Sequence, residues 1–357
     1  EGPHIYKKDG YYYLLISEGG TAYEHALAVA ISDEITGPYQ SNPRNPVLSH
    51  RQLSYDTPIS GVGHADIVEL EDGRWYAVAL GWRLVDGRHG ILGRETFLVP
   101  MRWELEPYTW KDPQFVWPVF SPVTGRVELN VPAPFAGVVQ DRLASLRDEF
   151  DSDELGLEWN FRRAPRSEFH DLRARPGWLR LKLQQGSLVD RGQYSFVGVR
   201  QRHFQFEAST RVEFAARHQE SAGLVVIQND KSAFELTLAE VDGNRVISLQ
   251  QLLNGERTLL AAADLASSPS CLKVIGDYLD YRFLFSADGE QWQQLGTTVD
   301  GTALSPTVLD GYNYTGVYIG LYATANGGSP GNHADFDFFG YTPTAKDADA
   351  WYRRQTA

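Results

Sequence analysis

Cysteine is almost absent from this 357-residue sequence, and its scarcity excludes several kinds of site. Cys271 is the only one, so the chain holds no intrachain disulfide and no thiol-rich metal centre. No hydrophobic run is long enough for a membrane span, and we expect no membrane partner. Lys and Arg total 33 against 46 Asp and Glu, and the net charge of -13 disfavours nucleic acid. A homo-oligomer stays open.

Helical periodicity is equally scarce along the chain. Short aromatic and β-branched runs recur instead, separated by Gly, Pro, Asp and Asn turns, and this pattern predicts an all-β fold. Two hairpins with Asp-Gly turns, at Asp9-Gly10 and Asp72-Gly73, lie about 60 residues apart, a spacing typical of propeller blades. Residues 1–130 contain strands for about two four-stranded blades. The N-terminus shows neither an initiator Met nor a targeting pattern, so the compartment, cytoplasmic or secreted, is unknown.

The character of the sequence changes after residue 130. Residues 131–147 are proline-punctuated and then charged, which predicts a linker. Residues 148–343 contain evenly spaced strands and turns, the pattern of a β-sandwich of jelly-roll type, and 344–357 form a C-terminal tail. Three tryptophans are expected to fill the core of this sandwich: Trp159, Trp178 and Trp292.

Three stretches of the first domain carry more polar and glycine residues than a blade requires. They are the opening Glu1-Gly2-Pro3-His4, continued by Glu18-Gly19-Gly20-Thr21 and Tyr23-Glu24-His25, then "SGVGHADIVE" with His64, and "LGRETFLVPMRW" with Arg94. Each stretch lies where a loop meets a strand. In a propeller such junctions converge near the central axis, so the three stretches are candidates for one shared pocket.

Each candidate also has an ordinary structural explanation. A terminal glutamate such as Glu1 is usually solvated, and a histidine after glycine, such as His64, is more often structural than a ligand. Arg94 next to Glu95 fits a surface ion pair, which contributes about 0 to 1 kcal/mol. The functional interpretation therefore depends on the three stretches occurring together, in this order.

These stretches resemble a known family. "EGPHIYKKDGYYYLLISEGGT", "GHADIVELEDGRWYAV" and "LGRETFLVPMRW" are similar to the second half of the catalytic propeller in family 43 of the glycoside hydrolases, the β-xylosidases and α-L-arabinofuranosidases. "SAGLVVIQND", "FSADGEQW" and "GVYIGLYATANG" resemble the C-terminal β-sandwich of many xylan-acting members. The resemblance implies part of a five-bladed propeller followed by a concanavalin-like sandwich, and hydrolysis with inversion at the anomeric carbon.

The resemblance also implies roles for individual residues. Glu1, in Glu-Gly-Pro, would be the general acid, with a pKa raised by a neighbouring carboxylate or by burial. Arg94, in "GRET", would bind the sugar, together with His4 and Thr21. His64, in "GHA", would support a structural calcium ion at the propeller axis, directly or through water, although imidazole is an unusual ligand for calcium. No organic cofactor is expected.

Two carboxylates of the family pattern have no match in the sequence. Relatives carry an aspartate base and an aspartate that tunes the acid, both N-terminal to the Glu-x-Pro motif, and the base lies about 6.5 to 9.5 Å from the acid. We therefore expect a missing N-terminal propeller segment, from the same precursor or from a separate chain. The substrate would be a xylan- or arabinoxylan-type oligosaccharide that loses β-xylosyl or α-L-arabinofuranosyl units. The alternative is a non-catalytic, glycan-binding propeller fragment with a sandwich.

Overall fold

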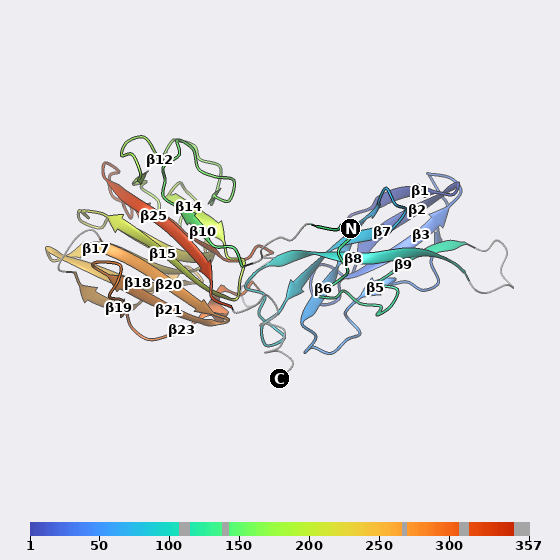
Figure 1. Ribbon diagram of the computed structural model, residues 1–357. Helices are drawn as coiled ribbons and strands as arrows, with labels where there is room; N and C mark the ends of the chain where they lie inside the picture. The colour runs from blue at the N-terminus through green and yellow to red at the C-terminus, as the bar shows by residue number, and fades with distance from the viewer. Residues whose placement is uncertain (107–114, 138–142, 266–269, 307–313, 346–357) are drawn as a thin grey trace. The chain divides into compact units, whose positions relative to one another are not determined.

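The fold consists of two compact units, Glu1–Val139 and Gln140–Ala357, divided inside the predicted linker. The computed structural model describes residues 1–106, 115–137, 143–265, 270–306 and 314–345. Nearly all regular structure in these residues is β-strand, with one short 3-10 helix, η1 (Gly301–Leu304). Among them no helix is long and apolar enough to cross a bilayer. The all-β prediction is confirmed (Figure 1).

The first unit contains two antiparallel sheets in which consecutive strands lie side by side, except that β5 pairs with β3 (Figure 1). The five-stranded sheet comprises β1 (His4–Lys8), β2 (Tyr11–Glu18), β3 (Ala26–Ser32), β4 (Gln40–Ser41) and β5 (Leu48–Ser49). The four-stranded sheet comprises β6 (Ile59–Glu69), β7 (Trp75–Arg83), β8 (Arg94–Leu105) and β9 (Val116–Phe120). Two successive meanders of this size agree with the expected two blades.

Both predicted hairpins are present, and each opens one sheet of the first unit. Asp9 and Gly10 join β1 to β2 with φ angles of 50° and 88°, the two positive values that a tight hairpin turn requires. Gly73, between β6 and β7, has a φ of 82°. Alternate residues of β2, such as Tyr13 and Leu15, are buried in a core that the two sheets share.

The strand β6 is irregular where it enters its sheet. Its pairing with β7 shifts register between Ser60 and Gly63 and again between Gly63 and Asp66. Such shifts are β-bulges, which bend a strand and redirect side chains. Gly61 and His64 have φ angles of 60° and 48°, a left-handed backbone that suits glycine and is uncommon for histidine. The bulges thus give the "SGVGHA" segment a backbone course that a regular strand does not have.

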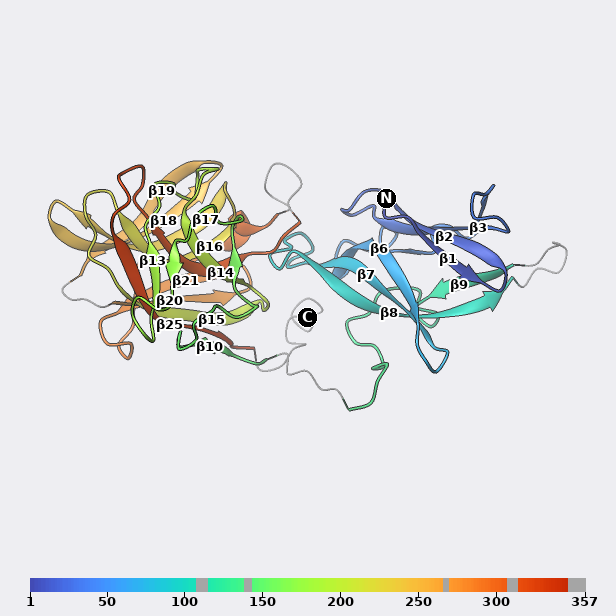
Figure 2. The same cartoon turned by 90° about the horizontal axis from the view of Figure 1, so that it is seen from above.

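The second unit is a β-sandwich of two antiparallel sheets, seen as two layers in Figure 2. The nine-stranded sheet comprises β10 (Leu146–Asp148), β12 (His170–Asp171), β13 (Leu179–Lys182), β15 (Gln205–Glu213), β20 (Ser270–Asp277), β21 (Asp280–Ser286), β22 (Gln293–Gln294), β23 (Val299–Asp300) and β25 (His333–Pro343). The seven-stranded sheet comprises β11 (Asn160–Phe161), β14 (Ser195–Arg200), β16 (Ser221–Asn229), β17 (Ser232–Val241), β18 (Asn244–Leu253), β19 (Glu256–Asp264) and β24 (Tyr318–Thr324).

The three tryptophans of the sandwich differ in burial. Trp159 is buried, as expected. Trp178 and Trp292 are only partly buried, and a cation lies over each ring: Arg175 is 3.6 Å from the centroid of the Trp178 ring and Lys273 is 4.3 Å from the centroid of the Trp292 ring. The expectation that all three fill the core is therefore wrong for two of them. A cation over the face of a partly exposed tryptophan contributes about 0.5 to 1 kcal/mol.

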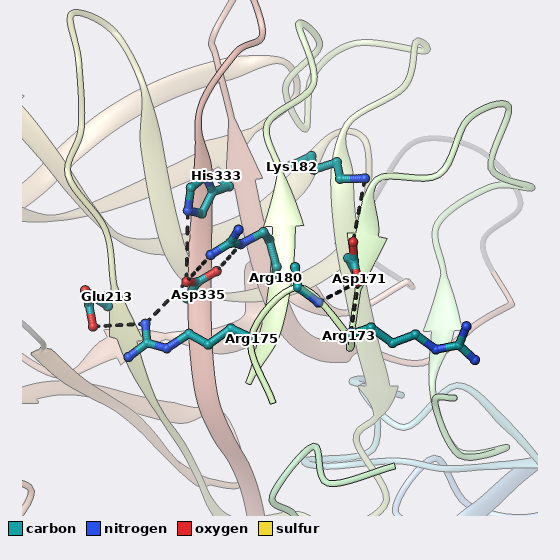
Figure 3. A network of polar contacts seen from close by, with 9 residues as sticks. Asp171, Arg173, Arg175, Arg180, Lys182, Glu213, His333 and Asp335 are labelled. Carbon is teal, nitrogen blue, oxygen red and sulfur yellow. Dashed lines mark hydrogen bonds and ion pairs between the residues drawn. The ribbon is translucent and has the colours of Figure 1, made fainter. Parts of the chain in front are cut away.

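A network of charges joins three strands of the nine-stranded sheet around Asp335 (Figure 3). Arg180 donates to both carboxylate oxygens of Asp335, at 2.7 and 2.8 Å, and Arg175 reaches Asp335 and Glu213 at 3.3 and 3.1 Å. Burial alone would raise the pKa of Asp335, but the hydrogen bonds and charges of the two arginines outweigh it and hold that pKa below its ordinary value.

Replacing Asp335 with alanine is expected to destabilise the sandwich by about 2 to 4 kcal/mol, because two arginines lose a buried partner. Asp337→Ala is the matched control on β25, since Asp337 forms one longer contact, 3.4 Å to Arg211, and its loss should cost under about 1 kcal/mol. Because the folded pKa of Asp335 is depressed, its contribution is present above about pH 4 and is lost as the pH falls through the folded value. Urea unfolding at pH 7 and pH 3 measures both effects, and equal losses in the two variants would contradict the assignment.

Candidate active site

The candidate site begins at Glu1, which lies beside the end of β2. The Ser17 N–H donates to the Glu1 carbonyl at 2.9 Å, and the amino group of Glu1 donates to the Ser17 carbonyl at 2.7 Å. These bonds extend the β1–β2 ladder and fix the backbone of Glu1. Its side chain remains 47% exposed, so the carboxylate is accessible from solvent.

Two histidines flank the Glu1 carboxylate. Oε1 of Glu1 lies 3.2 Å from Nδ1 of His64 and 3.8 Å from Nε2 of His25. The bulged backbone places His64 here, where its N–H donates to Ser17 Oγ at 2.6 Å. Gly2 lies close to the His64 ring. A Cβ at this position would stand only 2.7 Å from Nε2 of His64, so a larger residue would collide with the ring. The glycine of Glu-Gly-Pro therefore allows the Glu1 side chain and His64 to meet.

His25 is completely buried behind Glu1. Its Nδ1 lies 3.0 Å from the Gly61 carbonyl oxygen, which can only accept, so Nδ1 carries the proton and Nε2 faces the carboxylate. Nε2 is buried without a hydrogen-bond partner. The ring packs on the backbone of Gly63, where any Cβ would collide with it. Two glycines of the bulged strand β6 thus hold His25: Gly61 accepts its hydrogen bond and Gly63 packs against its ring.

Arg94 is held at the same site by Thr21. The NH1 group of Arg94 donates to Thr21 Oγ1 at 3.0 Å, and the Trp82 indole N–H donates to the Thr21 carbonyl at 3.3 Å. Trp82 is 7% exposed and lies against Gly61, at which a Cβ would stand 2.8 Å from the indole. The charge of Arg94 also acts on His25. The Glu1, His25 and Arg94 side chains therefore form one electrostatic group.

The pKa directions follow from these contacts. The hydrogen bond from His64 lowers the pKa of Glu1, burial opposes this effect, and the charge of His25 adds to the lowering. Burial lowers the pKa of His25 against its bond to Gly61 and the charge of Glu1. These surroundings favour an ionised Glu1 at neutral pH. A general acid must be protonated, so proton donation requires a further group that raises this pKa.

Two sequence-based alternatives can be compared with the contacts. His4 contacts Asp66 on β6, where its Nδ1 lies 3.0 Å from Oδ1 of the aspartate. Glu95 forms its ion pair with Arg83, at 2.8 Å, across the β7–β8 pair. Arg94 is therefore directed to Thr21 rather than to the glutamate that follows it. Glu1, Thr21, His64 and Arg94 are brought together, whereas His4 lies with Asp66.

The surroundings of His64 do not match what calcium prefers. Among the described residues no group of three or more His, Cys, Asp or Glu side chains converges on a possible metal site. Calcium takes six to eight oxygen ligands, whereas His64 offers an imidazole whose Nδ1 already contacts Glu1. The calcium ion stays a prediction, and no reaction step is assigned to it.

Two residues of this group have no individual role in the sequence-based prediction, namely His25, which lies in the first polar stretch, and Trp82. A signal for both exists in the alternating glycines Gly61 and Gly63, since glycine inside a strand marks a close approach by another group. Gly61 accommodates Trp82 and Gly63 accommodates His25. Nothing in the periodicity shows which rings fill those spaces, because they come from other strands and loops.

Two family models match the chain and together cover most of it. The model for glycosyl hydrolases family 43 matches residues 1–106. The model for the beta-xylosidase C-terminal concanavalin A-like domain matches residues 147–342. The sandwich is therefore concanavalin-like, and the two meanders belong to the propeller of this family, as predicted.

Similar proteins come from several bacteria. A non-reducing end α-L-arabinofuranosidase, BoGH43B, of Bacteroides ovatus is 37% identical over 96% of this chain, and a xylosidase/arabinosidase of Butyrivibrio fibrisolvens is 34% identical over 95%. The chain spans 62% and 63% of the length of these two relatives.

Solved structures agree with these matches. The structure titled Bacteroides ovatus xyloglucan PUL GH43B has a TM-score of 0.84 at 37% identity and covers 96% of this chain and 66% of its own. A xylan β-1,4-xylosidase from Bacillus halodurans has a TM-score of 0.83 at 29% identity, with 96% and 64% covered. Both units of this chain thus correspond to units of known enzymes, and the chain belongs to glycoside hydrolase family 43.

Proposed function

We propose that this chain forms the acid side of the active site of an inverting exo-glycosidase that removes β-xylosyl or α-L-arabinofuranosyl units from xylan-type oligosaccharides. One observation carries the proposal: Glu1, the carboxylate of the Glu-Gly-Pro motif, and Arg94 share a site around the buried His25 in a member of family 43.

In the proposed reaction Glu1 donates its proton to the glycosidic oxygen as the bond from that oxygen to the anomeric carbon breaks. Arg94, oriented by Thr21, donates hydrogen bonds to hydroxyls of the terminal sugar. Trp82 fixes the Thr21 backbone and so fixes Arg94 indirectly. His64 orients the Glu1 carboxylate.

The water-activating base is proposed to come from a segment outside this sequence. The charges of His25, His64 and the amino group lower the pKa of Glu1, the opposite of what a general acid needs. A second carboxylate near Glu1 would raise its pKa to the range a general acid needs and would reverse the lowering caused by His64. The base and this tuning carboxylate are the two aspartates of the family pattern.

The choice between the two sugars stays open. Relatives of the chain are named as an arabinofuranosidase, a xylosidase/arabinosidase and a β-xylosidase. The first of these names specifies the non-reducing end, and we propose that the sugar released here is terminal as well. We treat xylose as the leaving-group unit in the experiments below.

The test is hydrolysis of aryl β-D-xyloside and aryl α-L-arabinofuranoside by the purified protein, with and without sodium azide. If the base is supplied elsewhere, the chain alone should be slow, and azide should restore turnover by attacking the anomeric carbon in place of water. Inversion predicts that the β-xyloside yields α-xylosyl azide, or α-xylose when water reacts, and proton NMR of the first product distinguishes the anomers.

A retained anomeric configuration would contradict the inverting mechanism. A failure of both substrates, with azide present and with the chain folded, would contradict catalysis and favour the non-catalytic glycan-binding alternative.

A further inference from the structure

A stacked pair of tyrosines lies in the loops next to the candidate site and has no part in the proposed reaction. The rings of Tyr23 and Tyr55 have centroids 4.6 Å apart and planes inclined by 23°. Tyr55 is 72% exposed, the highest value for an aromatic side chain in the part of the chain that the structure describes. Tyr23 therefore backs one face of Tyr55, and the other face is open to solvent.

Both rings sit on a backbone that is held in place. The Tyr23 hydroxyl donates to the Leu53 carbonyl at 2.9 Å, which fixes its ring against the segment that carries Tyr55. Gly87, in the β7–β8 loop with a φ of 65°, packs so closely on Tyr55 that a Cβ would stand 2.6 Å from the Tyr55 carbonyl oxygen. The pair is thus formed before any ligand binds, and a preformed surface loses little entropy on binding.

The position of Tyr23 ties the pair to the Glu1 and Arg94 group. Tyr23 is two residues from Thr21, which accepts from Arg94, and two residues from His25, which faces Glu1. Because consecutive Cα atoms are about 3.8 Å apart, the Tyr23 Cα lies within about 8 Å of the Cα atoms of both neighbours. The pair therefore stands at the rim of the site.

The chemistry of this rim suits a neutral sugar. The face of an aromatic ring is electron-rich and attracts the C–H groups on the apolar face of a pyranose, while tyrosine offers a large contact at little entropic cost. Glu24 and Asp56, each next in sequence to one of the tyrosines, are exposed and can accept hydrogen bonds from sugar hydroxyls. An aromatic surface bordered by acceptors is what a hydroxylated ring requires.

We propose that Tyr55, backed by Tyr23, is the stacking platform for the xylose unit on the leaving-group side of the cleaved bond. This inference rests on the proposed function. Arg94 is half-buried and holds the terminal sugar, whereas Tyr55 faces solvent, where the substrate continues into the polymer.

The test is a binding titration that does not depend on catalysis. The 357-residue chain is titrated with xylotriose and with methyl β-D-xyloside, and proton NMR measures the binding of each. The methyl group of the second ligand is too short to reach the platform. Tyr55→Ala should weaken xylotriose binding about threefold to tenfold and leave the methyl xyloside unchanged. Tyr55→Phe should bind like the parent, and Phe135→Ala, which removes another exposed aromatic ring, should change neither ligand.

The outcomes separate the platform from the reaction. Equal binding of xylotriose by Tyr55→Ala and the parent, equal weakening of both ligands, or a chain that binds no xylotriose would each overturn the platform. Binding of xylotriose that depends on Tyr55, in a protein that fails to hydrolyse or to form a glycosyl azide, would support the platform and reject the proposed reaction.

Discussion

Replacing Glu1 with glutamine is expected to lower kcat on xylobiose by about 10²- to 10⁴-fold, the usual contribution of a general acid. The amide keeps the size of the side chain and a contact to His64, but it has no proton to give to the departing sugar oxygen. Steady-state release of xylose measures the effect, with azide present if the chain turns over only in its presence.

The leaving group provides the control for this variant. A 2,4-dinitrophenolate is a weak base and departs without protonation, so Glu1→Gln should lower its release less than tenfold. Glu71→Gln removes an exposed carboxylate from the turn between β6 and β7 and should leave both substrates close to the parent. Equal losses on xylobiose and on the dinitrophenyl xyloside would show that Glu1 positions the substrate and is not the acid.

Replacing Arg94 with alanine is expected to lower kcat/KM by about 10- to 100-fold for every substrate, whatever its leaving group. The proposed charge-assisted hydrogen bond from Arg94 to the terminal sugar, worth about 1.5 to 3 kcal/mol, is lost in this variant. Because the sugar that Arg94 contacts is the same in xylobiose and in the dinitrophenyl xyloside, both should lose equally. This independence of the leaving group is what distinguishes Arg94 from Glu1 in the same assay.

Arg83→Ala is the matched control for Arg94. Arg83 comes from the neighbouring strand β7, where it pairs with Glu95, and it should affect stability more than kcat/KM. If Arg83→Ala lowered kcat/KM as strongly as Arg94→Ala, the effect would be due to disruption of the β7–β8 pair. Thermal unfolding of both variants, measured beside the kinetics, reports that disruption directly.

The sequence predicts those parts of the fold that depend on local chemistry. Asp9-Gly10 and Asp72-Gly73 are turn signals, and both form hairpins that open a sheet, the first through a two-residue turn and the second through a longer one. The alternation along β2 identifies its buried face, because successive side chains of a strand point to opposite sides of the sheet. The motifs identify Glu1, Thr21, His64 and Arg94, and the fold brings Glu1 to His64 and Arg94 to Thr21.

The rest of the site depends on contacts between distant segments. Ring packing selects His25 and Trp82 through the Cβ-free faces of Gly63 and Gly61, and a single-sequence pattern does not reveal which ring enters each space. The role of His4 as a sugar ligand stays a prediction, and its contact with Asp66 on the bulged strand β6 could not be read from the sequence. Trp178 and Trp292 were expected in the core because tryptophan is apolar, yet a neighbouring cation stabilises each of them at the surface.

The two bulges of β6 have a consequence for how the length of this segment can vary. From Ser60 to Gly63 the strand advances three residues while β7 advances two, and the same happens from Gly63 to Asp66. Two extra residues equal one full period of a strand, so Ile67 still faces the core and Val68 still faces outward. Losing one residue between Ser60 and Asp66 would exchange those faces along the rest of β6. We therefore expect this segment to tolerate insertions and deletions of two residues and not of one.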